Sequence, residues 1–221
     1  MGVVEPSPDF LPGLRKLCDQ QGIVLIFDEV ITGFRLSFQG AQGYYGISPD
    51  LTTFGKIIGA GMPVGAYGGK KEIMQLVAPC GPVYQAGTLS GNPVSVAAGL
   101  CQLKILRDHP EIYCTLEKLG DQLRQGLREM IKQTGAPCSV TGVGSLCCLF
   151  FTSKSVANYE DAQHCDTSLF SQYFHHMLSH GFYMAPSQFE AIFLSYSHTQ
   201  EILQNTLACA NDFFQKKGWS R

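Results

Sequence analysis

Apolar residues occur in short runs along the chain, and the first of these runs predicts a strand of a parallel sheet. Residues 23–27 are apolar at every position, and Asp28 and Glu29 follow them directly. An unbroken apolar run is typical of a parallel strand that is buried on both faces. Ligands of open parallel sheets bind at the carboxyl ends of the strands. We therefore expect Asp28 and Glu29 to point into a site or to lie near one.

The rest of the chain alternates between strand and helix patterns, which indicates an α/β fold. Positions 116, 119, 123, 127 and 130 are leucine or methionine at helical spacing, and they predict an amphipathic helix that runs to residue 134. Further strands are expected at 51–54, 64–69, 139–143, 146–152 and 191–195, and further helices at 11–20, 70–77, 94–106, 167–179 and 199–215. Because the composition changes near residue 108, we expect residues 1–107 to be part of a parallel α/β domain and residues 108–221 to form a smaller α/β domain.

Composition and charge exclude several classes of protein. The 221 residues are 45% hydrophobic and 15% charged, with a formal net charge of −2. Disordered chains have lower hydrophobicity and higher net charge, and nucleic-acid binders usually carry a surplus of basic residues. The apolar runs are far shorter than the roughly 20 residues of a membrane helix, and the first residues lack the cationic and apolar regions of a signal peptide. We therefore expect a cytoplasmic protein that binds neither nucleic acid nor membrane.

The cysteines and histidines do not predict a metal site. The nine cysteines include no CxxC pair, and in a chain of this length without a secretion signal we expect reduced thiols. Most of them are interpreted as small buried hydrophobic residues. Cys147 and Cys148 are adjacent in a strand-like run, where successive side chains point to opposite faces. His175 and His176 are also adjacent, and we expect both on a solvated helix face.

Lys56 is the strongest candidate for chemistry. It follows the strand expected at 51–54 and lies among Gly55, Gly59 and Gly61, which let the backbone approach a ligand closely. A lysine in such a place is expected to be desolvated, which lowers the pKa of its amine, and a neutral amine attacks carbonyl groups. A surface lysine in a glycine-rich loop would show the same spacing.

Asp28 supplies a second group that fits the same chemistry. A carboxylate at a buried strand end is costly unless it is paired. The ring nitrogen of pyridoxal phosphate is kept protonated by an aspartate, and the aldehyde of the same cofactor suits a lysine. Taken alone, Asp28 would be interpreted as a cap or turn residue.

Residues 87–93 (GTLSGNP) lead into an expected helix. A hydroxyl and free backbone N–H groups at a helix start suit a phosphate group. Ordinary N-capping explains the same residue types, so the segment alone leaves both interpretations open.

These segments resemble class III aminotransferases, which are pyridoxal-phosphate enzymes of fold type I. The resemblance rests on residues 27–35 (FDEVITGFR), 49–56 (PDLTTFGK) and 87–93. Four further segments sharpen it to the glutamate-1-semialdehyde aminomutases: 40–46 (GAQGYYG), 65–69 (GAYGG), 84–88 (YQAGT) and 185–191 (APSQFEA). The resemblance implies that residues 1–107 are the C-terminal part of the cofactor-binding large domain and that 108–221 are the small C-terminal domain. Because enzymes of this family have a long N-terminal half before the aspartate strand, we interpret the chain as the C-terminal half.

The resemblance also implies a role for each candidate residue. Lys56 corresponds to the lysine that binds pyridoxal phosphate covalently and later moves protons. Asp28 corresponds to the partner of the ring nitrogen, and Val30 to a residue that packs against the ring. Thr88 corresponds to the residue that reaches the cofactor phosphate of the neighbouring subunit, so a homodimer of the complete enzyme is implied. Glu190 corresponds to a glutamate near the substrate pocket.

The implied reaction is an internal exchange of an amino group. The pyridoxamine form of the cofactor gives its amine to the aldehyde carbon of glutamate-1-semialdehyde and then takes the other amine, which leaves 5-aminolevulinate for tetrapyrrole synthesis. Two alternatives remain open. The chain is another class III aminotransferase, acting on ornithine or an ω-amino acid, or it is a non-catalytic remnant that only associates with a partner subunit.

Overall fold

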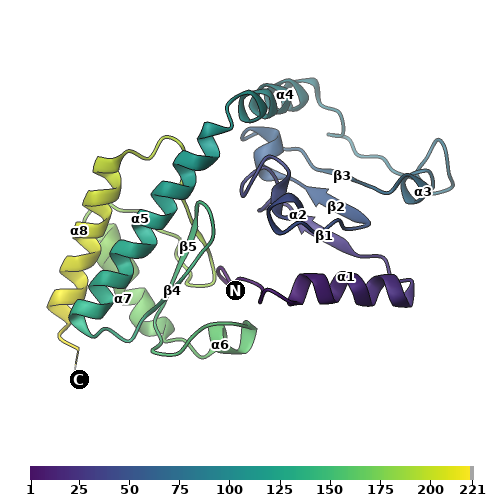
Figure 1. The fold of residues 1–221 in the computed structure, drawn as a ribbon. Helices are drawn as coiled ribbons and strands as arrows, with labels where there is room; N and C mark the ends of the chain where they lie inside the picture. The colour runs from purple at the N-terminus through teal and green to yellow at the C-terminus, as the bar shows by residue number, and fades with distance from the viewer. Residues whose placement is uncertain (220–221) are drawn as a thin grey trace. The chain divides into compact units, whose positions relative to one another are not determined.

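The computed structural model describes residues 1–219, which form two compact units (Figure 1). The first unit is Ser7–Tyr113. The second unit combines Met1–Pro6 with the chain from Cys114 onward, so it is discontinuous in the sequence. The domain boundary expected after residue 107 stays a prediction, and the division between the two units follows Tyr113.

The first unit contains a three-stranded mixed sheet. Its elements are α1 (Phe10–Gln21), β1 (Ile26–Glu29), α2 (Gly40–Tyr45), β2 (Leu51–Phe54), the 3-10 helix η1 (Lys56–Gly59), β3 (Ala66–Gly69), α3 (Lys71–Met74) and α4 (Pro93–Asp108). The strand order is β1-β2-β3, with β1 and β2 parallel and β2 and β3 antiparallel. The parallel register places Asp28 opposite Thr53.

Strand β1 is an edge strand among the described residues, and much of its apolar run is exposed. Ile23, Val24 and Ile26 are 53, 50 and 54% exposed, whereas Leu25 is buried. The expectation that this run is buried on both faces is therefore wrong for this structure, because within residues 1–219 only β2 pairs with β1. Exposed strand edges of this kind favour pairing with another chain.

Asp50 connects three parts of the first unit. Its carboxylate is buried and accepts hydrogen bonds from the Leu25 N–H at 2.6 Å, from Arg15 Nη1 at 2.9 Å and from Lys70 Nζ at 2.5 Å. Arg15 lies on α1, Leu25 precedes β1 and Lys70 follows β3. The Lys70 ammonium and the Leu25 N–H hold the pKa of the Asp50 carboxyl well below its usual range.

Glu29 anchors helix α2 through its buried carboxylate. Its side chain is fully buried and accepts hydrogen bonds from the backbone N–H groups of Ala41 at 2.6 Å and Gln42 at 3.0 Å. Thr32 Oγ1 at 3.0 Å and Gln42 Nε2 at 3.1 Å also donate to this carboxylate. A Cβ on Gly40 (φ +70°) would lie 2.3 Å from Glu29 Oε2, so only glycine fits this approach. Glu29 and Asp28 are neighbours on β1 whose side chains point to opposite faces, so Glu29 lies near the candidate site through Asp28, and its own carboxylate is used by α2.

The second unit contains a three-stranded antiparallel sheet and four helices within the described residues. Its elements are α5 (Glu111–Thr134), which starts before the division of the units, β4 (Ser139–Thr141), β5 (Leu146–Phe150), α6 (Tyr159–Gln163), α7 (Thr167–Ser179), β6 (Ile192–Phe193) and α8 (Gln200–Lys217). The strand order is β4-β5-β6. Across residues 1–219, no helix combines the length and the apolar character of a membrane span.

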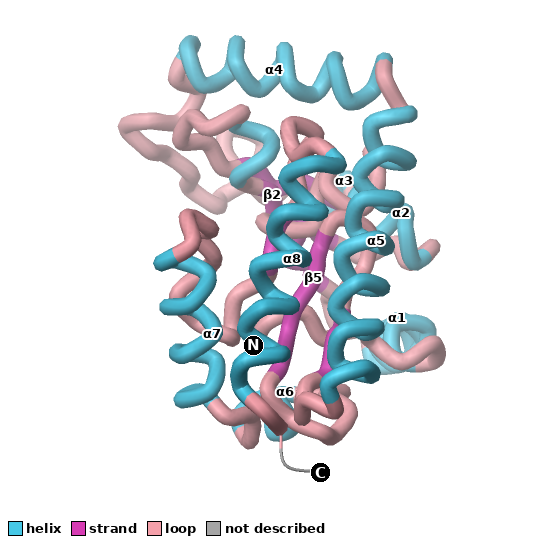
Figure 2. Tube along the Cα trace, turned by 90° about the vertical axis from the view of Figure 1, so that its left-hand side faces the viewer, coloured by secondary structure: helices cyan, strands magenta, loops and turns pink. Residues whose placement is uncertain are grey.

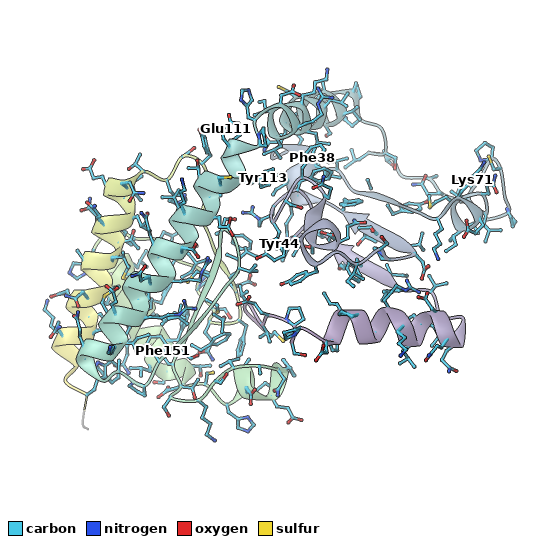
Figure 3. All side chains as sticks on the ribbon, in the orientation of Figure 1. Phe38, Tyr44, Lys71, Glu111, Tyr113 and Phe151 are labelled. Carbon is cyan, nitrogen blue, oxygen red and sulfur yellow. The ribbon has the colours of Figure 1, made fainter. Side chains whose placement is uncertain are left out.

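The core of the second unit lies between β5 and the helices α5, α7 and α8 (Figure 2). Phe151, labelled in Figure 3, sits in this core, with its ring centroid 5.7 Å from that of Tyr173 and 6.5 Å from that of Phe214. The predicted amphipathic face of α5 is confirmed, because it supplies Leu119, Leu123, Leu127 and Met130 to the core.

Strand β5 is buried at every residue, and different parts of the chain cover its two faces. Cys147 belongs to the core that the helices cover. On the other face, a Cβ on Gly2 would lie 2.7 Å from Cys148 Sγ and 2.8 Å from Phe150 Cζ. The segment Met1–Pro6 therefore packs on this face, and the N-terminus lies beside β5 in both Figure 1 and Figure 2.

All nine cysteines are free thiols, and five of them are buried: Cys18, Cys147, Cys148, Cys165 and Cys209. Burial raises the pKa of the Cys147 thiol to about 12, so this thiol is an inert core residue. The expected burial is confirmed for these five. His175 lies on the exposed face of α7 as expected, whereas His176 is half-buried and contacts α8.

We expect Asp50→Asn to destabilise the first unit by about 3 kcal/mol, because it removes one member of a buried charged cluster. Hydrogen exchange at the Leu25 amide and in β1 and β2 measures this loss. Asp19→Asn is the matched control, since Asp19 also pairs with Arg15 but is largely exposed. Unchanged protection of the Leu25 amide in Asp50→Asn would contradict the prediction.

The same contacts predict an acid-sensitive first unit. Because folding lowers the pKa of Asp50, its contribution to stability is complete above the unfolded-state pKa of about 4 and is lost as the pH falls below it. The chain with Asp50→Asn should lack this part of the acid dependence, whereas Asp19→Asn should retain it.

Candidate functional site

Lys56 begins η1 directly after strand β2, in an uncommon backbone conformation. Its φ is +49°, a left-handed value. Among the described residues other than glycine, Phe34 and Ala60 also have a positive φ. Such conformations cost of order 1–3 kcal/mol and cluster at ligand sites. The expected desolvation is wrong for this structure, because Lys56 is exposed. Its neighbours Gly55 and Gly59 have no side chains with which to cover it.

Asp28 lies at the carboxyl end of β1 with an ordered carboxylate. Its Oδ1 accepts hydrogen bonds from the Val30 N–H at 3.0 Å and from Thr53 Oγ1 at 3.2 Å. The first bond is the turn interaction that Asp28 alone would suggest, and the second ties the side chain to β2. Asp28 is exposed rather than buried, because β1 is an edge strand. A carboxylate has about four acceptor positions, so Asp28 keeps capacity for a further donor.

The parallel pairing of β1 with β2 brings Asp28, Val30 and Lys56 to the side of the sheet where both strands have their carboxyl ends. Asp28 is opposite Thr53, and Lys56 follows shortly after Thr53 on the same strand end. A Cβ on Gly55 would lie 3.3 Å from Val30 Cγ1, so Val30 packs directly beside the residue that precedes Lys56. The carboxyl ends of β1 and β2 therefore carry the amine of Lys56, the carboxylate of Asp28 and the apolar side chain of Val30.

Thr88 lies in the exposed loop before α4. The cap of that helix is Asn92, whose Oδ1 accepts from the Val94 N–H at 3.1 Å and the Ser95 N–H at 3.2 Å. Capping therefore explains Asn92 and does not involve Thr88. The loop and the segment before β3 enclose a hollow of about 570 Å³, lined by Pro63, Val64, Gly65, Ala66, Tyr67, Gln85, Leu89, Ser90 and Gly91.

Glu190 belongs to the second unit, where it is exposed and lines a pocket of about 680 Å³. Residues 181–187 and 191–194, His198 and parts of α5 and α8 also line this mainly apolar pocket. Asp28, Val30 and Lys56 thus lie at the same end of the sheet in the first unit, whereas Glu190 belongs to the second unit.

The structure adds Gln188, to which the sequence analysis assigned no role. Its side chain is buried, and among the described residues neither atom of its amide has a hydrogen-bond partner. Gln188 and Glu190 both line a cavity of about 20 Å³, which is enough for one water molecule. Because buried amides are costly without a partner, Gln188 is a candidate polar group of this pocket. Its position two residues before Glu190 is the one sequence signal.

Comparison with known proteins gives one consistent family. The sequence profile described as "Aminotransferase class-III" matches residues 1–207. The chain is 56% identical over 215 residues to "Glutamate-1-semialdehyde 2,1-aminomutase 2" of Lachnoclostridium phytofermentans, covering 97% of the chain and 50% of that protein. It is 53% identical over 214 residues to the aminomutase of Clostridium kluyveri, covering 96% of the chain and 51% of that protein. The chain therefore spans about half the length of these curated relatives.

Solved structures give the same fold. A β-phenylalanine aminotransferase from Variovorax paradoxus superimposes with a TM-score of 0.90 at 34% sequence identity, over 98% of this chain and 50% of that one. The expected α/β architecture of a fold-type I transferase is confirmed by this match.

The left-handed conformation of Lys56 predicts a difference between two substitutions. Lys56→Gly should leave the first unit about 1 kcal/mol more stable than Lys56→Ala, because glycine adopts a positive φ without the Cβ penalty. Urea denaturation followed by far-ultraviolet circular dichroism and hydrogen exchange measures the difference. Ala60→Gly, at φ +50°, is the control that tests the same relief away from the amine. Equal stability of Lys56→Gly and Lys56→Ala would show that the backbone is unstrained.

Proposed function

Because the chain belongs to the class III aminotransferase family, we propose that it is the C-terminal half of a pyridoxal-phosphate enzyme that isomerises glutamate-1-semialdehyde to 5-aminolevulinate. The observation that carries this choice is the similarity to the curated relatives. The chain is 53–56% identical, over 96–97% of its length, to proteins named glutamate-1-semialdehyde 2,1-aminomutase.

The residues present fit the cofactor. Pyridoxal phosphate offers an aldehyde, a basic ring nitrogen and a phosphate. Lys56 presents an exposed amine for the aldehyde, and the Asp28 carboxylate lies on the same sheet edge for the ring nitrogen. Thr88 offers an exposed hydroxyl for the phosphate of a neighbouring subunit. When bound, the cofactor supplies an electron sink for proton transfer at the carbon that carries the amine.

The chain's own residues would position and move protons. Asp28, held by Thr53 Oγ1 at 3.2 Å, would keep the ring nitrogen protonated. Val30, packed against Gly55, would support one face of the ring beside Lys56. The Lys56 amine would remove the proton from the carbon that carries the amine, and the resulting ammonium would give a proton back, as a positioned general base and acid does. Glu190 would contact the substrate from its pocket in the second unit.

The proposal includes a homodimer and a cytoplasmic location. The homodimer follows from the role proposed for Thr88, which acts on the cofactor of a partner subunit. The nine free cysteines agree with a reducing compartment.

We expect the chain by itself to bind pyridoxal phosphate weakly or not at all. The reason is that Lys56, Asp28 and Thr88 are all exposed here, so that few contacts would hold the cofactor. An absorbance titration followed by borohydride reduction and peptide mapping measures both affinity and position, with Lys56→Arg as the control. Tight, stoichiometric fixation at Lys56 would contradict this prediction.

The activity is tested by complementation. We would co-express the chain with the part of the Lachnoclostridium phytofermentans aminomutase that it does not match, and supply glutamate-1-semialdehyde without an amino donor. We expect 5-aminolevulinate to form, and Lys56→Ala to lower the rate about a thousandfold, as loss of a general acid–base does.

Two outcomes would overturn the proposed activity. Turnover that requires an added amino donor would make the chain an ordinary aminotransferase. A stable complex with no turnover, while the complete relative is active in the same assay, would make it a non-catalytic partner.

A further inference from the structure

The second unit holds a cluster of metal-binding residue types outside the site described above. His176 and His180 of α7 and Cys209 of α8 each present one ligand atom, and these atoms lie within 4.8 Å of one another. The centroids of the two imidazole rings are 4.3 Å apart. No role proposed above uses any of the three residues.

Helix geometry explains why these residues meet. His176 and His180 are four residues apart, so they lie on one face of α7, whereas the adjacent His175 lies on the exposed face. Helix α8 packs against that face, because His176 Nε2 lies 3.1 Å from the carbonyl oxygen of Cys209. Asp212, one turn further along α8, brings Oδ2 to 3.5 Å from His176 Nε2.

One ring nitrogen of each histidine in the cluster lies within hydrogen-bond distance of a carbonyl oxygen, as does that of the adjacent His175. His180 Nδ1 lies 2.8 Å from the carbonyl oxygen of His176. A ligating histidine commonly uses one ring nitrogen for such a carbonyl, which orients the ring and leaves the other nitrogen for the metal. His180 is also the C-cap of α7, where the helix dipole favours a positive charge.

We propose that His176, His180 and Cys209 bind a Zn²⁺ ion that joins α7 to α8, with Asp212 beside it. Two imidazoles and a thiolate are ligands that Zn²⁺ prefers, whereas Mg²⁺ and Ca²⁺ prefer oxygen ligands. The Cys209 thiol would release its proton to solvent when the ion binds. Metal–ligand distances of about 2.0–2.3 Å require the three atoms to come closer than in this structure. The exposed His180 side chain and the half-buried His176 have room for this adjustment. The ion would be structural, fixing two helices of the core to each other.

Co²⁺ is the probe, because it replaces Zn²⁺ and reports thiolate coordination by its spectrum. The chain is purified without a histidine tag, in a background in which the exposed thiols of Cys80, Cys101 and Cys114 are serine. We expect one Co²⁺ per chain with a sulfur-to-cobalt charge-transfer band, and displacement of Co²⁺ by one equivalent of Zn²⁺.

Four variants locate the site. Cys209→Ser should abolish the charge-transfer band, and His180→Ala should weaken Co²⁺ binding at least tenfold. Asp212→Asn should weaken it about tenfold, as loss of an outer-shell partner does. His175→Ala is the matched control and should change nothing, since His175 is exposed and its ring nitrogen bonds to the Ser171 carbonyl oxygen of its own helix.

A folding control keeps the test decisive. Trp219 Nε1 donates to the Phe214 carbonyl oxygen at 3.0 Å, so its fluorescence reports the integrity of α8. Because His180 is exposed, His180→Ala should keep that fluorescence, and Zn²⁺ should raise the melting temperature of the parent chain but not of this variant. Absence of the charge-transfer band in the parent chain, or equal Co²⁺ affinity of His180→Ala and His175→Ala, would overturn the proposal.

Discussion

The buried carboxylate of Asp50 is the contact on which the first unit depends. It accepts hydrogen bonds from the Leu25 N–H before β1, the Arg15 guanidinium of α1 and the Lys70 ammonium after β3. These contacts fix the start of the parallel pairing between β1 and β2. A slip of one residue in that pairing would turn every side chain of β1 to the opposite face. The position of Asp28 beside the strand end that leads to Lys56 therefore rests on a residue that takes no part in the proposed chemistry.

Three acidic residues of this sheet have separate functions. Asp50 fixes the start of β1. Glu29, the last residue of β1, holds the N-terminus of α2, and Asp28, the residue before it, remains exposed. The sequence could identify Asp28 as a candidate, but it could not separate Asp28 from Glu29. That distinction depends on the face to which each side chain points and on the glycine at position 40, which lets a backbone amide reach Glu29.

The local pattern of apolar and turn residues predicted most helices and strands. The burial of a side chain could not be predicted in the same way, because it depends on the segments that pack beside it. The strand 51–54 and the helix 167–179 have the expected bounds, because turn residues and apolar spacing mark both ends. The short helices α2 and α6 were missed, since the six residues of α2 and the five of α6 are too few to establish a periodicity. The exposure of Ile23 and Lys56 could not be foreseen, because covering a side chain requires groups from elsewhere in space. For the same reason, the adjacent pair His175 and His176 gave no sign in the sequence that His176 lies beside Cys209, 33 positions away.

The contact of Met1–Pro6 with β5 has a consequence for the stability of the second unit. The Met1 amino group bonds to the Phe189 carbonyl oxygen, 188 positions away in the sequence. Gly2 packs on Cys148 and Phe150 of the central strand. Loss of this one segment would therefore uncover one face of β5 while leaving every residue of the helix-covered core in place, so the stability of the second unit depends on residues that are separated from it in the sequence by the whole first unit.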